Sequence, residues 1–139
     1  MGKHAIIVIK NEKNEYLQYF DKKWNSYLFL NCKMKDKDDL DSITSELKKS
    51  LGIQKEDINL LFAGERMHTK FSESAKIEKE YQHYFYKVEL LKPIDSLNEN
   101  EVKKQTRIYK WFSYDELKND KRIQQVNSDI VEYIRELNI

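Results

Sequence analysis

The chain has 139 residues, with 25 basic and 24 acidic side chains and a formal net charge of +1. Such a length predicts one domain over residues 1–139, and the balanced charge argues against bulk nucleic-acid binding or a polybasic membrane contact. No apolar run approaches the roughly 18 residues needed to span a bilayer, and the single Cys32 cannot form an internal disulfide. We therefore expect a cytoplasmic domain.

Three strands are predicted near the N-terminus. Residues 4–10 (HAIIVIK) are apolar and β-branched, which is typical of a buried strand. The turn sequence NEKN leads to a second strand at 15–21, and residues 24–30 (WNSYLFL) form a third. A charged, solvated loop follows at 33–38.

A helix is predicted from Asp38 or Asp39 to Leu51. A short carboxylate at its start accepts hydrogen bonds from free backbone N–H groups, and Gly52 supplies the left-handed residue that ends it. The stripe expected to face the core, at three- and four-residue spacing, consists of Leu40, Ile43, Leu47 and Leu51.

The second half of the chain alternates extended segments with helix signals. Residues 58–69 and 81–90 are predicted to pair as strands around a loop at 72–80, and residues 107–112 form a last strand.

Two helical signals close the chain. Ser113 caps a short turn with Glu116 at the capping-box position, and Asn127 or Ser128 opens a C-terminal helix. The order β-β-β-α-β-β-β-α predicts an α+β fold in which helices flank a mixed sheet.

One segment resembles a known signature. Residues 45–53 (SELKKSLGI) match the end of G-x5-E-x7-R-E-U-x-E-E-x-G-U, where U is bulky and aliphatic, at Glu46, Leu47, Gly52 and Ile53. That signature belongs to the Nudix hydrolases. Residues 109–117 (YKWFSYDEL) are similar to a W-x-x-x-x-E-L segment common late in Nudix chains. The resemblance covers nearly the whole chain and implies a Nudix-like α/β/α sandwich.

The chain departs from the Nudix signature at several positions. Aligned without gaps, Lys49 and Ser50 occupy the positions of the paired glutamates, with Asn31, Lys37 and Ser45 at the first Gly, the loop Glu and the Arg.

A one-residue deletion gives a second alignment. It places residues 29–33 (FLNCK) on the usual F-P-G-G-K and Asp38 on the loop Glu. In this alignment Lys33 occupies the position of the box lysine.

The resemblance gives these departures a chemical meaning. Nudix hydrolases cleave a nucleoside diphosphate linked to another group, using water and Mg²⁺ held by glutamates on one helix face. Here that face carries Glu46, Lys49 and Ser50, and one carboxylate beside one ammonium cannot hold the ion in this way. Glu46 is then a vestigial or weak catalytic residue.

Our hypothesis for the missing metal is that the Lys49 ammonium takes over its space and charge. The alternative is a lysine that points into solvent. We expect Lys49→Glu with Ser50→Glu to create Mg²⁺ affinity.

If a metal binds at all, its candidate ligands are Asp38, Asp39 and Glu46. The alternative for these loop carboxylates is a solvated position that the helix dipole favours.

Other residues are candidates for ligand binding. Lys33 is a candidate phosphate contact, Lys49 is a further candidate ligand-binding residue, and Arg66 suits bidentate phosphate binding. His68 shares a strand face with Arg66, and the ring of Tyr84 suits stacking on a base. The alternative for the aromatic residues is a structural role in the core.

The remaining histidines and the cysteine receive plainer predictions. His4 and His83 lie in predicted strands and are expected to be core histidines with satisfied hydrogen bonds. Cys32 is expected to be inert.

Three functions follow from the resemblance. The first is a catalytically degenerate Nudix-like domain that binds a nucleotide or nucleotide-derived ligand as a sensor or regulator, without a cofactor. The second is an active pyrophosphohydrolase with rearranged Mg²⁺ ligands, against which Lys49 and Ser50 count. The third is a protein-interaction module. Because Nudix proteins often dimerise, the resemblance also implies a homodimer.

Overall fold

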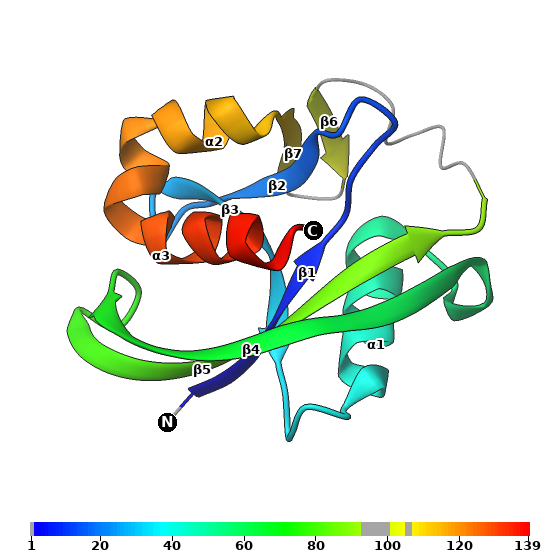
Figure 1. Cartoon of the computed structure of the whole chain (residues 1–139), viewed down its shortest axis with the longest axis horizontal. Coiled ribbons are helices and arrows are strands. Elements are labelled where there is room, and N and C mark those ends of the chain that lie inside the picture. Colours follow the sequence, from blue (N-terminus) through cyan, green and yellow to red (C-terminus); the bar gives the residue numbers. More distant parts are fainter. Residues whose placement is uncertain (1, 93–100, 105–106) are drawn as a thin grey trace.

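The computed structural model describes residues 2–92, 101–104 and 107–139 (Figure 1). Its elements in chain order are β1 (Gly2–Val8), β2 (Tyr16–Asp21), β3 (Ser26–Lys33), α1 (Leu40–Leu51), the 3-10 helix η1 (Lys55–Asp57), β4 (Ile58–Ser72), β5 (Ile77–Leu90), β6 (Glu101–Lys104), β7 (Arg107–Phe112), α2 (Tyr114–Asn119) and α3 (Lys121–Leu137).

The strands form a seven-stranded sheet in the order β4-β5-β1-β3-β2-β7-β6. β1 runs parallel to β5, and the other neighbouring pairs are antiparallel, so the sheet is mixed. β3 divides its pairing between two neighbours. Residues 26–29 pair with β2, and residues 30–33 pair with β1.

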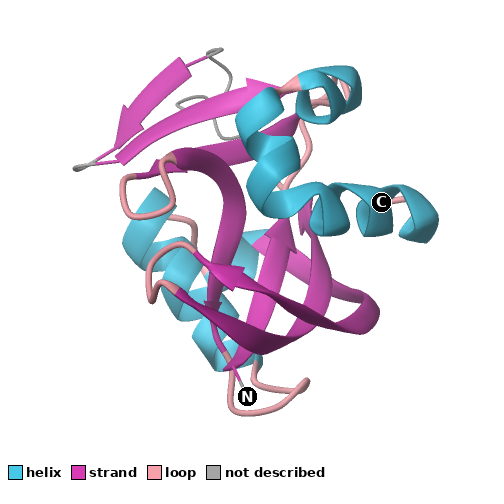
Figure 2. Ribbon diagram, turned by 90° about the vertical axis from the view of Figure 1, so that its left-hand side faces the viewer, coloured by secondary structure: helices cyan, strands magenta, loops and turns pink. Residues whose placement is uncertain are grey.

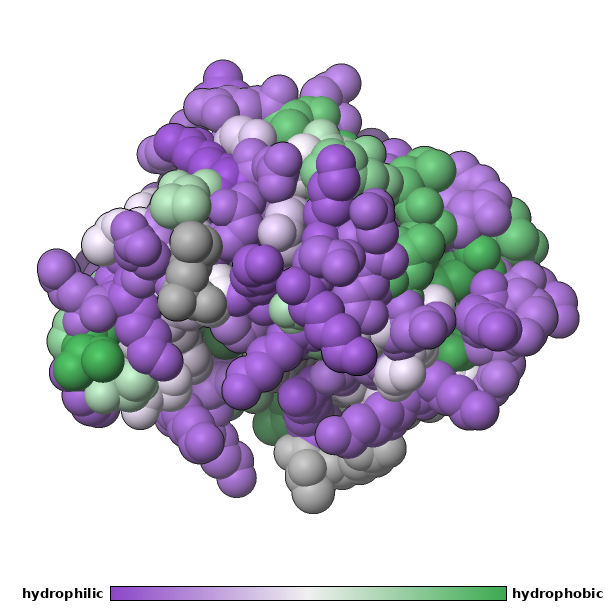
Figure 3. Space-filling view, turned by 90° about the horizontal axis from the view of Figure 1, so that it is seen from below, coloured by the Kyte–Doolittle hydropathy of each residue, from purple (hydrophilic) through white to green (hydrophobic). Residues whose placement is uncertain are grey.

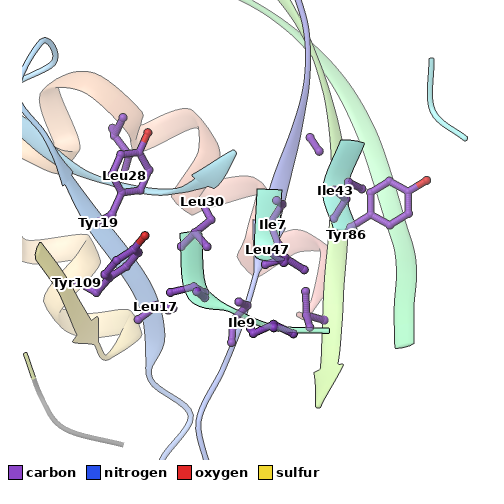
Figure 4. Packing of buried hydrophobic residues seen from close by; sticks show 14 of the residues in the cluster. Ile7, Ile9, Leu17, Tyr19, Leu28, Leu30, Ile43, Leu47, Tyr86 and Tyr109 are labelled. Atoms are coloured by element: carbon purple, nitrogen blue, oxygen red, sulfur yellow. The ribbon is translucent and has the colours of Figure 1, made fainter. Parts of the chain in front are cut away.

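Helices cover both faces of the sheet, as Figure 2 shows. α1 packs Ile43 and Leu47 onto sheet residues that include Ile7 (Figure 4). α2 and α3 pack Leu117 and Ile130 onto the opposite face. Each such buried side chain contributes about 1.5–3 kcal/mol relative to an exposed one. The predicted α/β/α sandwich is therefore confirmed.

The predicted ends of α1 are also confirmed. The Asp39 carboxylate accepts hydrogen bonds from the backbone N–H and the hydroxyl of Ser42, at 3.3 and 2.7 Å. Gly52 adopts φ 70° and donates its N–H to the Lys48 carbonyl at 2.9 Å. Leu40 was wrongly placed in the core stripe. It is 42% exposed, because the core contacts of the helix begin one turn later.

The loop predicted at 72–80 is wrong. β5 already begins at Ile77, so a tight turn at 73–76 joins it to β4, with Lys76 at φ 60°. The polar residues at the start of β5 lie on the exposed end of this hairpin. Strand pairing there continues without the apolar alternation that marks a buried strand.

The predicted start of the last helix is wrong as well. α3 begins after Asp120, whose carboxylate accepts from the Ile123 N–H at 2.9 Å. Asn127, the predicted start, is a kink inside this helix with φ −141° and ψ 24°. The predicted capping box of Ser113 and Glu116 is confirmed.

β6 was not predicted. Across the described ranges, no helix has the length and apolar character needed to cross a lipid bilayer.

Candidate functional site

A cavity of about 800 Å³ lies on the face of the sheet that α3 covers. The pairing of His4 with Lys33 on β3 and with His83 on β5 places these three side chains on that face. All three line the cavity, together with Tyr81 of β5 and Trp24 of the β2–β3 turn. The lining of the cavity therefore combines lysines with aromatic rings. Figure 3 shows that hydrophilic side chains dominate the lower side of the molecule as drawn in Figure 1.

The three histidines of the chain meet beside this cavity. Nδ1 of His68 lies 2.9 Å from Nδ1 of His83, whose ring stacks on Tyr81 at 5.5 Å and 12°. Tyr81 in turn lies 5.8 Å from the ring of His4. His68 itself does not line the cavity but supports His83 from β4.

These histidines are held in their uncharged form at neutral pH. Burial lowers the pKa of His83 to about 3, and the Lys70 ammonium acts in the same direction. Burial also lowers the pKa of His4, with Lys33 and Lys79 adding to the effect. Burial also lowers the pKa of His68, although the Asp129 carboxylate acts to raise it.

The expectation that the strand histidines are satisfied is wrong for His4. Its Nδ1 is buried and has no hydrogen-bond partner in the described part of the chain, and the same is true of Nε2 of His68.

Lys70 fixes α3 over this face of the sheet. Its ammonium donates to Oδ1 of Asn127 at 2.7 Å and to both carboxylate oxygens of Asp129, at 3.0 and 3.2 Å. Burial lowers the pKa of Lys70, and Asp129 opposes this shift. The three contacts span the kink of α3 and use the donors of the ammonium. Lys70 is therefore an anchor of the cavity wall.

The Nudix-like segment of α1 contacts a cation from a distant strand. Nη1 of Arg107 lies 3.8 Å from Oε2 of Glu46 and donates to Oγ of Ser50 at 3.2 Å. The Ser50 hydroxyl donates to Glu46. The same guanidinium lies 4.5 Å from the ring centre of Tyr19, and Tyr19 also lines the cavity.

Lys49 was the residue expected to replace a metal. It is exposed and lines a smaller hollow of about 400 Å³ together with Lys33, Asp39 and Glu46. Arg107, which sequence reasoning missed, is a cation that contacts both Glu46 and Ser50.

The residues of this segment do not fit Mg²⁺. The ion needs several hard oxygen ligands in near-octahedral geometry, whereas Glu46 is the one carboxylate here and Arg107 lies beside it. Asp39 is engaged in the helix cap, and Asp38 lies exposed in the loop. Within the described residues, no group of three or more His, Cys, Asp or Glu side chains is placed to hold a metal.

The other expected binding residues are spread over the sheet. Arg66 shares the cavity's face, but it pairs with Glu136 at 3.7 Å and stacks over Tyr133 at 5.0 Å, both on α3. Tyr84 packs in the core on the α1 side of the sheet, which is the face opposite to the one that carries Lys33. Of the expected set, Lys33 lies in the cavity and Lys49 in the smaller hollow.

Sequence reasoning missed Tyr81 and Lys79 as cavity residues and the meeting of His4 with His83. The signal would have been the parallel pairing of the first strand with the fifth, which local sequence patterns do not encode.

Comparison with solved structures decides the architecture. The C. elegans Ap4A hydrolase in a binary complex superposes with a TM-score of 0.64 over 99% of this chain and 96% of its own, at 16% identity. A hydrolase of the NUDIX family from Clostridium perfringens gives a TM-score of 0.55 over 98% of this chain and 94% of its own, at 16% identity. The chain has the Nudix fold. A MutT protein from Methanosarcina mazei Go1 gives a TM-score of 0.61 over 99% and 92% of the two chains, at 15% identity.

A further Nudix-fold neighbour is the E. coli dihydroneopterin triphosphate pyrophosphohydrolase, with a TM-score of 0.61 over 88% and 92% of the two chains, at 13% identity. At such identities the likeness concerns the fold alone. The sequence matches no protein-family model and no curated protein.

Proposed function

We propose that this Nudix-fold domain binds a nucleotide or nucleotide-derived ligand in the 800 Å³ cavity and does not hydrolyse it. The observation that carries the proposal is Arg107, whose guanidinium contacts Glu46 and Ser50 where a hydrolase needs carboxylates. A domain that holds a nucleotide unchanged suits a sensor or regulatory role. Glu46 is then a vestigial catalytic residue.

The chemistry of the cavity supports a nucleotide-like ligand. Its volume lies within the range of about 300–1,000 Å³ usual for small-molecule sites. Lys33 and Lys79 offer ammonium groups for phosphates, and Trp24 and Tyr81 offer rings on which a base stacks. The structural neighbours add weight, since two are named for Ap4A and for dihydroneopterin triphosphate.

The test is the thermal stability of the chain against a panel of nucleoside di- and triphosphates and dinucleoside polyphosphates, each with and without Mg²⁺. A ligand that binds only the folded state raises the melting temperature by mass action. We expect a shift that needs no metal. Lys33→Gln or Lys79→Gln should weaken binding roughly tenfold, equivalent to about 1.4 kcal/mol for one charged contact. Lys118→Gln, on the exposed side of α2, is the matched control and should bind like the wild type.

Two other outcomes lead to the alternatives. A shift that requires Mg²⁺, together with product release, would favour the active pyrophosphohydrolase, which the retained Glu46 and the hydrolase neighbours support. Asp38, Asp39 and Glu46 would then be its candidate ligands.

No shift across the panel would favour the protein-interaction module. The exposed Phe62, Met67 and Phe71 on the edge strand β4 support that alternative. The homodimer proposed from the resemblance is tested separately by light scattering.

A further inference from the structure

His4 lines the cavity, and the Nδ1 edge of its ring lies against the chain. A Cβ atom on Gly2 would lie 3.2 Å from Cε1 and 3.4 Å from Nδ1 of His4, so the backbone at Gly2 covers the Nδ1 edge. Nδ1 is buried without a partner among the described residues. Because His4 lines the cavity, Nε2 is the ring nitrogen left to meet a ligand.

Lysines from two neighbouring strands line the cavity together with His4. Lys33 of β3 is its register partner, and Lys79 lies on β5 two residues before Tyr81. Both ammonium groups lower the pKa of His4, after burial as the largest cause. Two ammonium groups and an imidazole that line one cavity favour the binding of an anion there.

The other titratable groups on this face are engaged differently. Lys70 of β4 is neutralised by Asp129 of α3, and neither contacts His4 directly in the ion pairs and hydrogen bonds of the structure. Asp21, Lys23 and Glu80 also line the cavity and bring charges of both signs to its wall.

The second histidine of the cavity, His83, is expected to stay neutral. The Nδ1–Nδ1 contact with His68 holds one proton between two ring nitrogens at 2.9 Å. A further proton on His83 is disfavoured because burial lowers the pKa of this histidine to about 3, and the Lys70 ammonium acts in the same direction. His4 is only half-buried, so it is the cavity histidine that more readily takes up a proton.

We propose that His4 takes up a proton from solvent at Nε2 when an oligophosphate binds between Lys33 and Lys79, so that the cavity binds the anion and the proton together. This inference rests on the proposed function, because it concerns the same cavity. It adds the chemical class of the anion, the strand residues that hold it, and a dependence of affinity on pH.

The physical reason is that the bound anion counteracts the two lysines, which favour the neutral form of His4. The negative charge of the anion offsets both ammonium groups and attracts the imidazolium, whose Nε2–H donates to a phosphate oxygen. Linkage is reciprocal, so the proton that the anion draws in also tightens the anion. Where one full proton is taken up, the dissociation constant falls about tenfold for each unit decrease in pH.

Calorimetry with sodium tripolyphosphate tests the inference on the full chain without Mg²⁺. Titrations at pH 7 in two buffers of different ionisation enthalpy give the number of protons taken up. Because tripolyphosphate itself titrates near this pH, the uptake assigned to His4 is the difference between wild type and His4→Gln. We expect a clear positive difference, with the variant still binding at pH 8.

Imidazole NMR supplies a measurement that needs no variant to fold. The chain has three histidines, so three ring signals are followed against pH. We expect tripolyphosphate to move the titration midpoint of one ring upward by at least one pH unit, and assignment to give that ring as His4.

The outcomes separate this inference from the proposed function. Nucleotide or tripolyphosphate binding with equal proton uptake in wild type and His4→Gln, and no change in the His4 midpoint, would overturn the inference and leave the proposed function standing. Absence of tripolyphosphate binding between pH 5.5 and 8 would overturn it as well. Proton-linked tripolyphosphate binding without any nucleotide binding would support the inference and count against the proposed function.

Discussion

The guanidinium of Arg107 lies 3.8 Å from the carboxylate of Glu46, and the ring centre of Tyr19 lies 4.5 Å from that guanidinium. The Tyr19 hydroxyl accepts a hydrogen bond from the Asn31 side-chain amide at 3.1 Å, and both residues line the cavity. One arginine therefore links the Nudix-like segment of α1 to the wall of the ligand cavity.

Replacing Arg107 by Gln should destabilise the fold. The Glu46 side chain is 17% exposed and would lose its cation, and Tyr19 would lose its cation–π contact. Since the Arg107 side chain is 39% exposed, solvent screening limits the expected loss to roughly 1 kcal/mol. Urea unfolding measures it. Lys110→Gln, which removes the cation over Phe112 from the same strand, is the matched control and should change stability by less than about 0.5 kcal/mol. Equal losses in the two variants would contradict the role of Arg107.

Metal binding by restored carboxylates on α1 should be weak while Arg107 is present. Lys49→Glu with Ser50→Glu restores two carboxylates, but residue 50 lies next to Nη1 of Arg107, so the new carboxylate at 50 is expected to pair with it. Adding Arg107→Gln should tighten Mn²⁺ binding at least tenfold, equivalent to about 1.4 kcal/mol. Calorimetry with Mn²⁺ compares the double and triple variants, and Lys48→Glu with Arg107→Gln is the control. Absence of Mn²⁺ binding in the triple variant would contradict the alignment of the segment with the Nudix signature.

Acid should destabilise the domain through His83. Its pKa is about 3 in the folded chain, against roughly 6.5 when unfolded. Between these values the unfolded chain binds a proton that the folded chain does not. The free energy of unfolding therefore falls as the pH drops below 6.5, by about 1.4 kcal/mol per unit for one proton, or about 2 kcal/mol down to pH 5. The lowered pKa values of His4 and His68 act in the same direction.

Urea unfolding at several pH values from 7.5 to 5 measures this slope. His83→Gln keeps a polar side chain near His68 and removes the titration, so its stability should depend less on pH by close to one proton. A slope unchanged by this substitution would show that His83 is not the group responsible.

Gly64 sits where β4 approaches α3. A Cβ atom there would lie 2.7 Å from Cδ2 of Leu137 and 3.3 Å from the hydroxyl of Tyr133, which donates to the Glu65 carbonyl at 2.9 Å. Gly64→Ala should cost up to about 1 kcal/mol, because the overlapping methyl group ends the half-buried Leu137 side chain, which can shift. Leu137→Ala in the same chain makes room for the new methyl group, so the double variant should be more stable than the sum of the single losses implies. Thermal unfolding of the four variants decides, and strictly additive losses would argue against the overlap.

Sequence reasoning succeeded where the signal is local. The cap at Asp39, the stop at Gly52 and the capping box after β7 are each encoded within a few residues, and the structure confirms them. Segments whose apolar residues alternate were found as strands. The exposed start of β5 was missed because its residues 78–80 are charged, although strand pairing continues there.

The site was less accessible to sequence reasoning, because it depends on pairing over long distances. Arg107 reaches Ser50 across 57 positions, through the placement of β7 beside β2. His83 and Tyr84 are neighbours in sequence, yet alternation turns one to the cavity and the other to the core under α1. Spacing alone could not show whether His83 or Tyr84 faces the cavity, because both faces of this buried strand carry aromatic residues.

Residues 30–33 of β3 pair with β1 in one register. This register decides which of their side chains face the cavity and which face α1. Lys33 points into the cavity, whereas Cys32 points toward α1, where burial, followed by the carboxylate of Glu46, raises the pKa of the thiol to about 12. A slip of one position would exchange the two, giving the cavity a thiol and the core an ammonium. The ladder between these two strands thus keeps the chain's one thiol in its protonated form.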